Sequence, residues 1–254
     1  QLQFNDHFYN FYSKNNRIEE ARIERETNEW IAGLNMSKNA PNYSIEKIKL
    51  ADFNIKNQDK FAEAKAVYEQ HFEGVFRKQF HSHHPIYSEF LESYSLLKTS
   101  IDEYDEAYRL AGERLKIANE KYGPESKDYA MALIQLSEIN ILKGEYDQAE
   151  SQLEVASEMI KSESSKKSRA YYTTLKNLGD IYMINGKYQE AENTYKKAFK
   201  MLKKSGEGGN LDIKSSEDMA KLYMTTGQYK DAENIIKQSI SANETKFGGD
   251  HFKL

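Results

Sequence analysis

Residues 175–198 read LKNLGDIYMINGKYQEAENTYKKA, with a break at Asn185-Gly186. Large apolar residues recur three or four positions apart on each side of the break, which places them on one face of each of two helices. Gly179 and Ala191 are small where the rest of the pattern is large, so the two helices can approach closely there. The stretch therefore predicts a helical hairpin with a glycine at its turn. The pattern consists of Leu175, Leu178, Gly179, Tyr182, Gly186, Tyr188, Ala191, Tyr195 and Ala198.

The hairpin pattern recurs along the chain. Its last three copies fit well, the second and third fit less closely, and the first fits poorly. A single hairpin cannot bury its own apolar faces, so the copies must stack on one another. The copies centre on Asn16, Asp59, Asp102, Gly144, Gly186 and Gly227, at steps of 41 to 43 residues. We expect a single array over residues 1–254, with units at about 1–35, 36–76, 77–121, 126–161, 169–204 and 211–246.

The order Leu178-Gly179, Tyr182, Gly186, Tyr188 and Ala191 resembles a tetratricopeptide repeat (TPR). A standard TPR unit has about 34 residues, so these units are about eight residues longer. The extra residues lie in connectors that share aromatic, Gly or Pro and polar residues: 80–87, 122–129 and 247–252. Repeats of this kind are similar to those of kinesin light chains and of bacterial TPR arrays fused to CHAT-type, caspase-like peptidase domains. The resemblance implies an all-α, right-handed superhelical solenoid of about six TPR-like hairpins.

The composition of the chain excludes several kinds of partner and of chemistry. The chain carries a formal net charge of −4, which favours neither nucleic acid nor an anionic membrane as a partner. No apolar run approaches the roughly 20 residues of a membrane span, so we expect no membrane insertion. The chain has no cysteine, which excludes disulfides, thiolate metal ligands and a cysteine nucleophile. This composition fits any redox compartment and leans slightly towards an extracytoplasmic one.

Catalytic and metal-binding patterns are weak. The sequence contains no Gly-x-Ser-x-Gly, no His-Glu-x-x-His and no phosphate-binding glycine loop, so we expect no enzyme activity and no cofactor. His81, His83 and His84 invite a metal interpretation. A short loop seldom places three imidazoles around one ion, and a solvated connector is the favoured interpretation. We therefore predict no metal site.

The TPR resemblance implies where a ligand would bind. In a TPR superhelix the first helix of each hairpin lines a concave groove, at positions near 2, 5, 6, 9 and 12 when the turn residue is position 15. Lys176 can pair with a ligand carboxylate, and Asn177 can bond an extended peptide backbone. A chaperone-tail clamp needs matching residues in three successive units, and only Lys176 and Asn177 fit. The candidate peptide-binding residues are Gln135, Glu138, Lys176, Asn177, Asp180, Met183, Asp218 and Lys221.

Two functions follow from this interpretation. The first is a non-catalytic scaffold that binds an extended peptide or a protein surface in the groove. The alternative is the regulatory or substrate-recognition arm of an enzyme, for example a CHAT-like peptidase, with its catalytic domain beyond residue 254. The chain begins at Gln1 and ends at Leu254 directly after a connector, so we expect it to be a fragment of a longer protein. The terminal repeat is a candidate surface for self-association.

Overall fold

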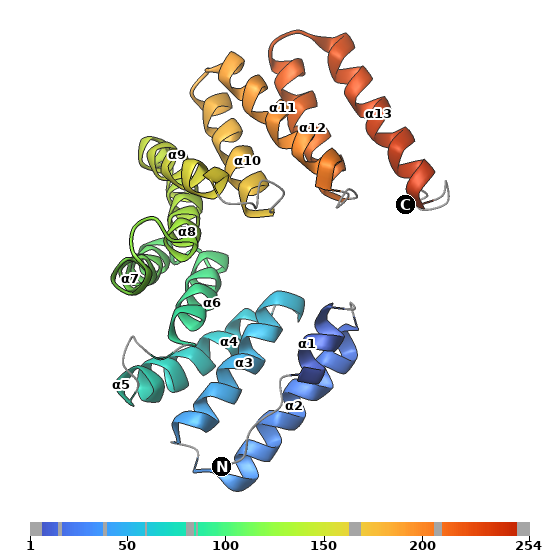
Figure 1. The fold of residues 1–254 in the computed structure, drawn as a ribbon. Helices are drawn as coiled ribbons and strands as arrows, with labels where there is room; N and C mark the ends of the chain where they lie inside the picture. Colours follow the sequence, from blue (N-terminus) through green and yellow to red (C-terminus); the bar gives the residue numbers. More distant parts are fainter. Residues whose placement is uncertain are drawn as a thin grey trace. The chain divides into compact units, whose positions relative to one another are not determined.

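The computed structural model describes residues 7–14, 17–37, 40–58, 60–79, 84, 86–162, 169–205 and 210–247. These residues form helices and short turns, and no strand occurs among them (Figure 1). The predicted all-α class is confirmed. The chain divides into two compact units, Gln1–Ile117 (unit 1) and Ala118–Leu254 (unit 2).

Unit 1 is built from consecutive helices that pack as hairpins. The second helix of its middle hairpin changes type twice along its length, from α4 through the π-helix η1 to α5. The last helix of the unit, α7, crosses the boundary between the two units. The elements are α1 (His7–Lys14), α2 (Ile18–Asn35), α3 (Pro41–Gln58), α4 (Phe61–Val67), η1 (Tyr68–Phe76), α5 (Arg77–Gln79), α6 (Tyr87–Ser100) and α7 (Tyr104–Tyr122).

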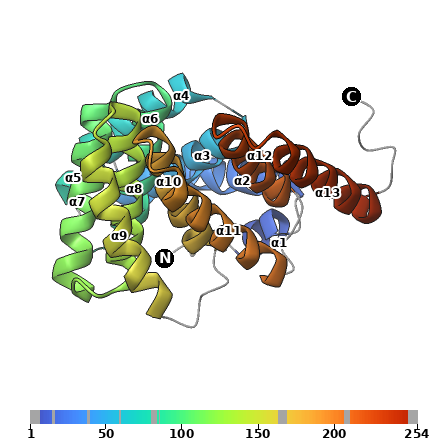
Figure 2. The same ribbon diagram turned by 90° about the horizontal axis from the view of Figure 1, so that it is seen from above.

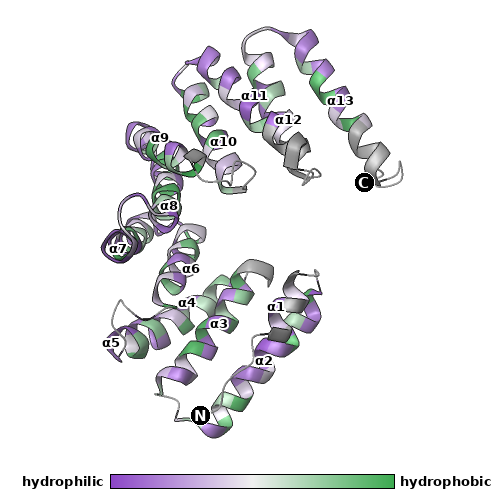
Figure 3. Cartoon of the chain, viewed as in Figure 1, coloured by the Kyte–Doolittle hydropathy of each residue, from purple (hydrophilic) through white to green (hydrophobic). Residues whose placement is uncertain are grey.

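Unit 2 continues the same scheme with regular α-helices. Figures 1 and 2 both show α12 and α13 lying side by side, and each hairpin of the unit also packs on the next. Along these helices apolar and polar residues alternate by face, as Figure 3 shows by colour. The helices are α8 (Lys127–Lys143), α9 (Tyr146–Ser162), α10 (Arg169–Ile184), α11 (Tyr188–Ser205), α12 (Asn210–Thr225) and α13 (Tyr229–Phe247).

The predicted turn residues adopt the left-handed conformation that ends a helix. Gly144, Gly186 and Gly227 have φ angles of 78°, 71° and 75°. This region costs L-residues a steric clash but is open to glycine. Asp102 occupies the equivalent place with φ 61°, and among the described residues no other non-glycine has a positive φ. The equivalent residues Asn16 and Asp59 lie outside the described residues.

The predicted close approach within the 175–198 hairpin is confirmed. A Cβ added at Gly179 would lie 2.4 Å from Cε1 of Tyr195, so the tyrosine ring occupies the space that any other residue would fill. Ala191 and Tyr195 belong to the core of unit 2. Tyr188, which the pattern also includes, is 41% exposed. It is the first residue of α11, and the core of the hairpin lies farther along that helix.

The π-helix is a feature that the sequence pattern did not predict. It covers Tyr68–Phe76 and buries Tyr68, Phe72 and Phe76 completely. These aromatic residues recur every four positions, and the wider π turn keeps them on one face of the helix. They pack against Tyr87, Phe90 and Tyr94 of α6, with Tyr68 stacked on Tyr94 at a ring-centroid distance of 4.5 Å. The core of unit 1 is therefore largely aromatic.

Candidate functional site

Three helices of unit 2 carry all eight residues predicted to bind a peptide. Each is the first helix of its hairpin: α8, α10 and α12. We call these eight residues the first-helix face of unit 2. Their side chains range from buried to exposed, so the face offers both fixed and accessible groups. Asn177 and Asp218 are buried, Gln135, Lys176, Asp180 and Met183 are half-buried, and Glu138 and Lys221 are exposed.

A chain of contacts leads from the core of unit 2 to Lys176. Because Gly179 lacks a side chain, Tyr195 of α11 lies directly on α10, and its hydroxyl donates to Oδ1 of Asp180 at 2.6 Å. Burial, reinforced by the negative charge of Asp180, raises the pKa of Tyr195, so its hydroxyl remains a donor. Asp180 in turn forms an ion pair with Lys176 one helical turn away. A ligand carboxylate would therefore meet an ammonium group that is already held in place.

Asn177 connects two hairpins. Its Nδ2 donates to Oε1 of Glu138 on α8 at 3.5 Å, a long hydrogen bond. Asn177 is 8% exposed, so its amide faces α8 more than solvent. A bond from Asn177 to a peptide backbone would require this contact to open. Lys221, an exposed member of the face, is reached without such a change.

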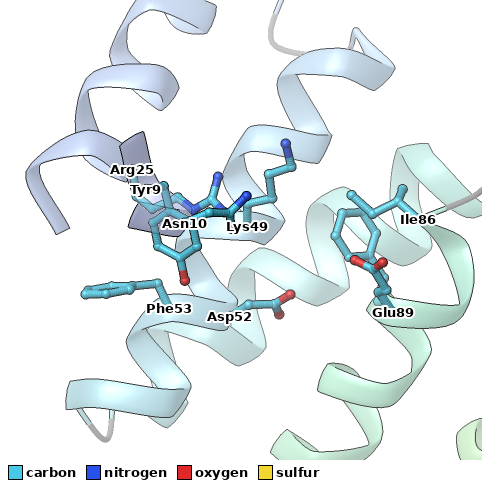
Figure 4. Close-up of a pocket in the computed structure, with 9 residues that line it drawn as sticks. Tyr9, Asn10, Arg25, Lys49, Asp52, Phe53, Ile86 and Glu89 are labelled. Atoms are coloured by element: carbon cyan, nitrogen blue, oxygen red, sulfur yellow. The ribbon is translucent and has the colours of Figure 1, made fainter. Parts of the chain in front are cut away.

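A cleft of about 410 Å³ lies in unit 1 (Figure 4). First helices supply most of its lining here as well, and Arg25 comes from the second helix α2. Counting positions from Asp59 and Asp102 places Lys49 at position 5, Phe53 at position 9 and Glu89 at position 2. Applying the groove-facing repeat positions to the less regular second and third copies of the repeat would thus have predicted these three residues. The cleft is lined by Tyr9, Asn10, Arg25, Lys49, Asp52, Phe53, Ile86, Glu89 and Phe90.

The contact between a core tyrosine and a first-helix aspartate occurs in both units. Tyr68 of η1 donates its hydroxyl to Oδ1 of Asp52 on α3, as Tyr195 of α11 does to Asp180 on α10. Tyr68 follows Ala64 by four residues, and Tyr195 follows Ala191 by four, so the two tyrosines hold the same place in the repeat. Burial is the main cause that raises the pKa of Tyr68. Each unit therefore fixes one first-helix carboxylate from its core.

Of the three histidines in the connector, the structure describes His84. His84 lies edge-on to Phe76 with ring centroids 5.4 Å apart, and burial lowers its pKa. His81 and His83 lie outside the described residues. Over the part of the chain that the structure describes, no three His, Cys, Asp or Glu side chains gather in a way that could hold a metal ion. Within the same ranges, none of the helices combines the length and apolar character needed to cross a bilayer.

Comparisons with known proteins identify the repeat. Residues 170–245 match the tetratricopeptide repeat family model, and a comparison with curated proteins finds no match. Among solved structures, BtubC (BKLC) from P. vanneervenii has a TM-score of 0.70 at 18% identity, covering 92% of each chain.

Two further structures are similar over most of this chain. A Podospora anserina protein described as a kinesin light chain with nearly identical TPR-like repeats has a TM-score of 0.66 at 17% identity, covering 82% of this chain and 98% of that one. The apo form of RapI has a TM-score of 0.63 at 15% identity, covering 97% of this chain and 76% of RapI.

These findings confirm the TPR recognition. Residues 170–245 match the TPR repeat, and the fold of the chain is similar to that of kinesin-light-chain TPR-like repeats. At these identities the structural likeness shows the fold alone. TPR repeats generally mediate protein–protein interactions, and proteins built from them are generally non-catalytic scaffolds. The predicted fusion to a CHAT-type domain gains no support and stays a prediction.

Proposed function

We propose that this chain is a non-catalytic scaffold that binds an extended peptide or protein segment across the first-helix face of unit 2. The TPR fold supports the class of partner, because its repeats generally bind proteins. The contact chain from Tyr195 through Asp180 to Lys176 is the observation that carries the proposal. It orients a charged group from the core before any ligand arrives, which lowers the entropy cost of binding.

The chemistry of the face suits a polypeptide more than a small molecule. Lys176 and Lys221 offer cations, Glu138 and Asp180 offer carboxylates, and Met183 adds an apolar, adaptable contact. These groups are spread over three helices, so many modest contacts would add up along an extended segment. The alternative role as the arm of a CHAT-like enzyme is compatible with the same face, and no described residue favours it over the scaffold.

The experiment selects short peptides from a displayed random library on the intact 254-residue chain. It then measures their affinity by fluorescence anisotropy. The test variant is Lys176→Glu combined with Lys221→Glu, which reverses both cations of the face. We expect about a tenfold loss of affinity, since each lost charge contact is worth about 0.5–1 kcal/mol.

A matched control keeps the charge change away from the face. Lys200 lies exposed on α11, the second helix of its hairpin. Lys200→Glu should bind the selected peptides as the wild type does. Circular dichroism should show equal helix content in all three proteins. If the double variant binds like Lys200→Glu, the peptide does not lie across this face and the proposed site is wrong.

A further inference from the structure

The positively and negatively charged side chains of the unit 1 cleft lie on different sides of it. In Figure 4 the cationic groups of Arg25 and Lys49 lie on the α2 and α3 side, while Asp52 points towards the α6 side, where Glu89 lies. Aromatic and aliphatic side chains, among them Phe53, Ile86 and Phe90, line the space as well. At about 410 Å³ the cleft has the size of ligand sites in proteins. It is large enough for one long side chain and part of its backbone.

The two cations of the cleft already have interaction partners. Lys49 pairs with Oε1 of Glu46 at 3.1 Å, and Glu46 is 3% exposed. The Arg25 guanidinium lies 3.5 Å from the centre of the Tyr9 ring, a cation–π contact. Their charge is therefore partly compensated within the protein.

The carboxylate of Glu89 is in a different situation. It is exposed, lines the cleft, and makes no hydrogen bond or ion pair with any described residue. Asp52, which also lines the cleft, is fixed by the hydroxyl of Tyr68, which is fully buried. The cleft thus presents one oriented carboxylate, from Asp52 on α3, and one uncommitted carboxylate, from Glu89 on α6.

We infer that this cleft accepts the basic side chain, lysine or arginine, of a polypeptide bound by the scaffold. The aliphatic part of such a side chain packs on the half-buried Ile86, and its charged end lies between Asp52 and Glu89. The inference rests on the proposed function, because it assigns the cation to the polypeptide ligand. It concerns a different unit, so its test uses a probe that does not depend on the first-helix face of unit 2.

The probe is N-acetyl-lysine methylamide, titrated into the intact, ¹⁵N-labelled chain and followed by amide chemical-shift changes. We expect the shifts to map to α3 and the start of α6, with affinity in the weak range of a single side chain. N-acetyl-norleucine methylamide has the same carbon skeleton without the ammonium group and should bind up to about fivefold more weakly. n-Pentylamine has the ammonium without the peptide groups and should also bind more weakly.

Glu89→Gln is the decisive variant, because Glu89 is exposed and holds no other described group. It should weaken binding of the lysine probe up to about fivefold and leave the norleucine probe unchanged. Glu63→Gln is the matched control: Glu63 is an exposed acid in the first turn of α4 and does not line the cleft. It should bind the lysine probe as the wild type does.

Three results would overturn the inference. The first is equal binding of the lysine and norleucine probes, because the carboxylates would then not act. The second is tighter binding of N-acetyl-glutamate methylamide, because Lys49 and Arg25 would then dominate the cleft. The third is binding of n-pentylamine as tight as that of the lysine probe, which would assign the cleft to free amines. Failure of the library-selected peptides at unit 2 leaves these results unaffected.

Discussion

Gly179 joins the packing of unit 2 to the chemistry of its first-helix face. The missing side chain lets Tyr195 reach Asp180, and Asp180 holds Lys176. The sequence shows the small residue and its large neighbours, so the close approach was predictable from spacing alone. The hydrogen bond from Tyr195 to Asp180 was not, because it depends on the rotation of α11 against α10.

Gly179→Ala should destabilise the protein. The new Cβ would lie 2.4 Å from Cε1 of Tyr195, so the ring must move out of a packed core. Overpacking of this kind costs about 1–3 kcal/mol, which corresponds to about 2–4 °C in Tm per kcal/mol. Differential scanning calorimetry measures the shift.

Gly112→Ala on α7 is the matched control, since a Cβ there meets nothing within 4 Å. Alanine inside a helix is better than glycine by about 0.5–1 kcal/mol, so this variant should raise Tm. A Gly179→Ala protein as stable as Gly112→Ala would contradict the close approach of the two helices.

The periodic pattern of the sequence does not predict how deeply each candidate ligand residue is buried. Asn177 and Asp218 sit at the same repeat position, and both are about nine-tenths buried. Counting positions places them on the first helix but does not say how far the neighbouring hairpin covers them. For Asn177 that cover includes Glu138, which lies 39 residues earlier in the sequence.

At the scale of elements, the turns were the most predictable feature. Glycine recurs at the end of α8, α10 and α12 because a left-handed residue is needed there, and no other residue adopts it as cheaply. The π-helix was not predictable. Its aromatic residues recur every four positions, which also fits an α-helix, and their packing against α6 accompanies the wider turn.

The turn between α6 and α7 is expected to be a weak point of unit 1. Asp102 takes φ 61°, where the equivalent residue at the other described turns is glycine. Asp102→Gly should stabilise the protein by about 0.5–1 kcal/mol, because glycine adopts this conformation without strain. The change loses only the exposed contact from the Tyr104 hydroxyl to Asp102. Urea unfolding should show a higher midpoint at an unchanged slope.

The reverse change serves as the control. Gly144→Asp places an aspartate at φ 78° in the turn between α8 and α9 and should lower stability by about 1 kcal/mol. Changes of opposite sign in the free energy of unfolding for Asp102→Gly and Gly144→Asp would identify the backbone conformation as the cause. If both variants change the free energy of unfolding in the same direction, side-chain contacts decide the stability of these turns.

At the scale of the whole molecule, repetition shapes stability. In a repeat protein each hairpin contacts mainly its neighbours, so stability is the sum of repeat and neighbour terms. The compact units Gln1–Ile117 and Ala118–Leu254 each have a core of their own. The regular period predicted the stacking of hairpins. It gave no sign of the division into two units, since the step between turns is nearly constant across that boundary.

This organisation predicts that damage in one unit stays local. Gly179→Ala should accelerate amide hydrogen exchange in α10, α11 and the adjoining hairpins of unit 2, and leave α3 and η1 of unit 1 unchanged. Ile48→Val removes one methyl group from the fully buried core of unit 1, at a cost of about 0.5–1.5 kcal/mol, and should give the opposite pattern. Hydrogen–deuterium exchange with peptide-level mass spectrometry reads both units in one experiment.

Equal acceleration in both units from either variant would show that the chain opens as one cooperative body. Ligand binding at one unit would then be felt at the other, whereas local opening lets the first-helix face of unit 2 and the cleft of unit 1 bind independently.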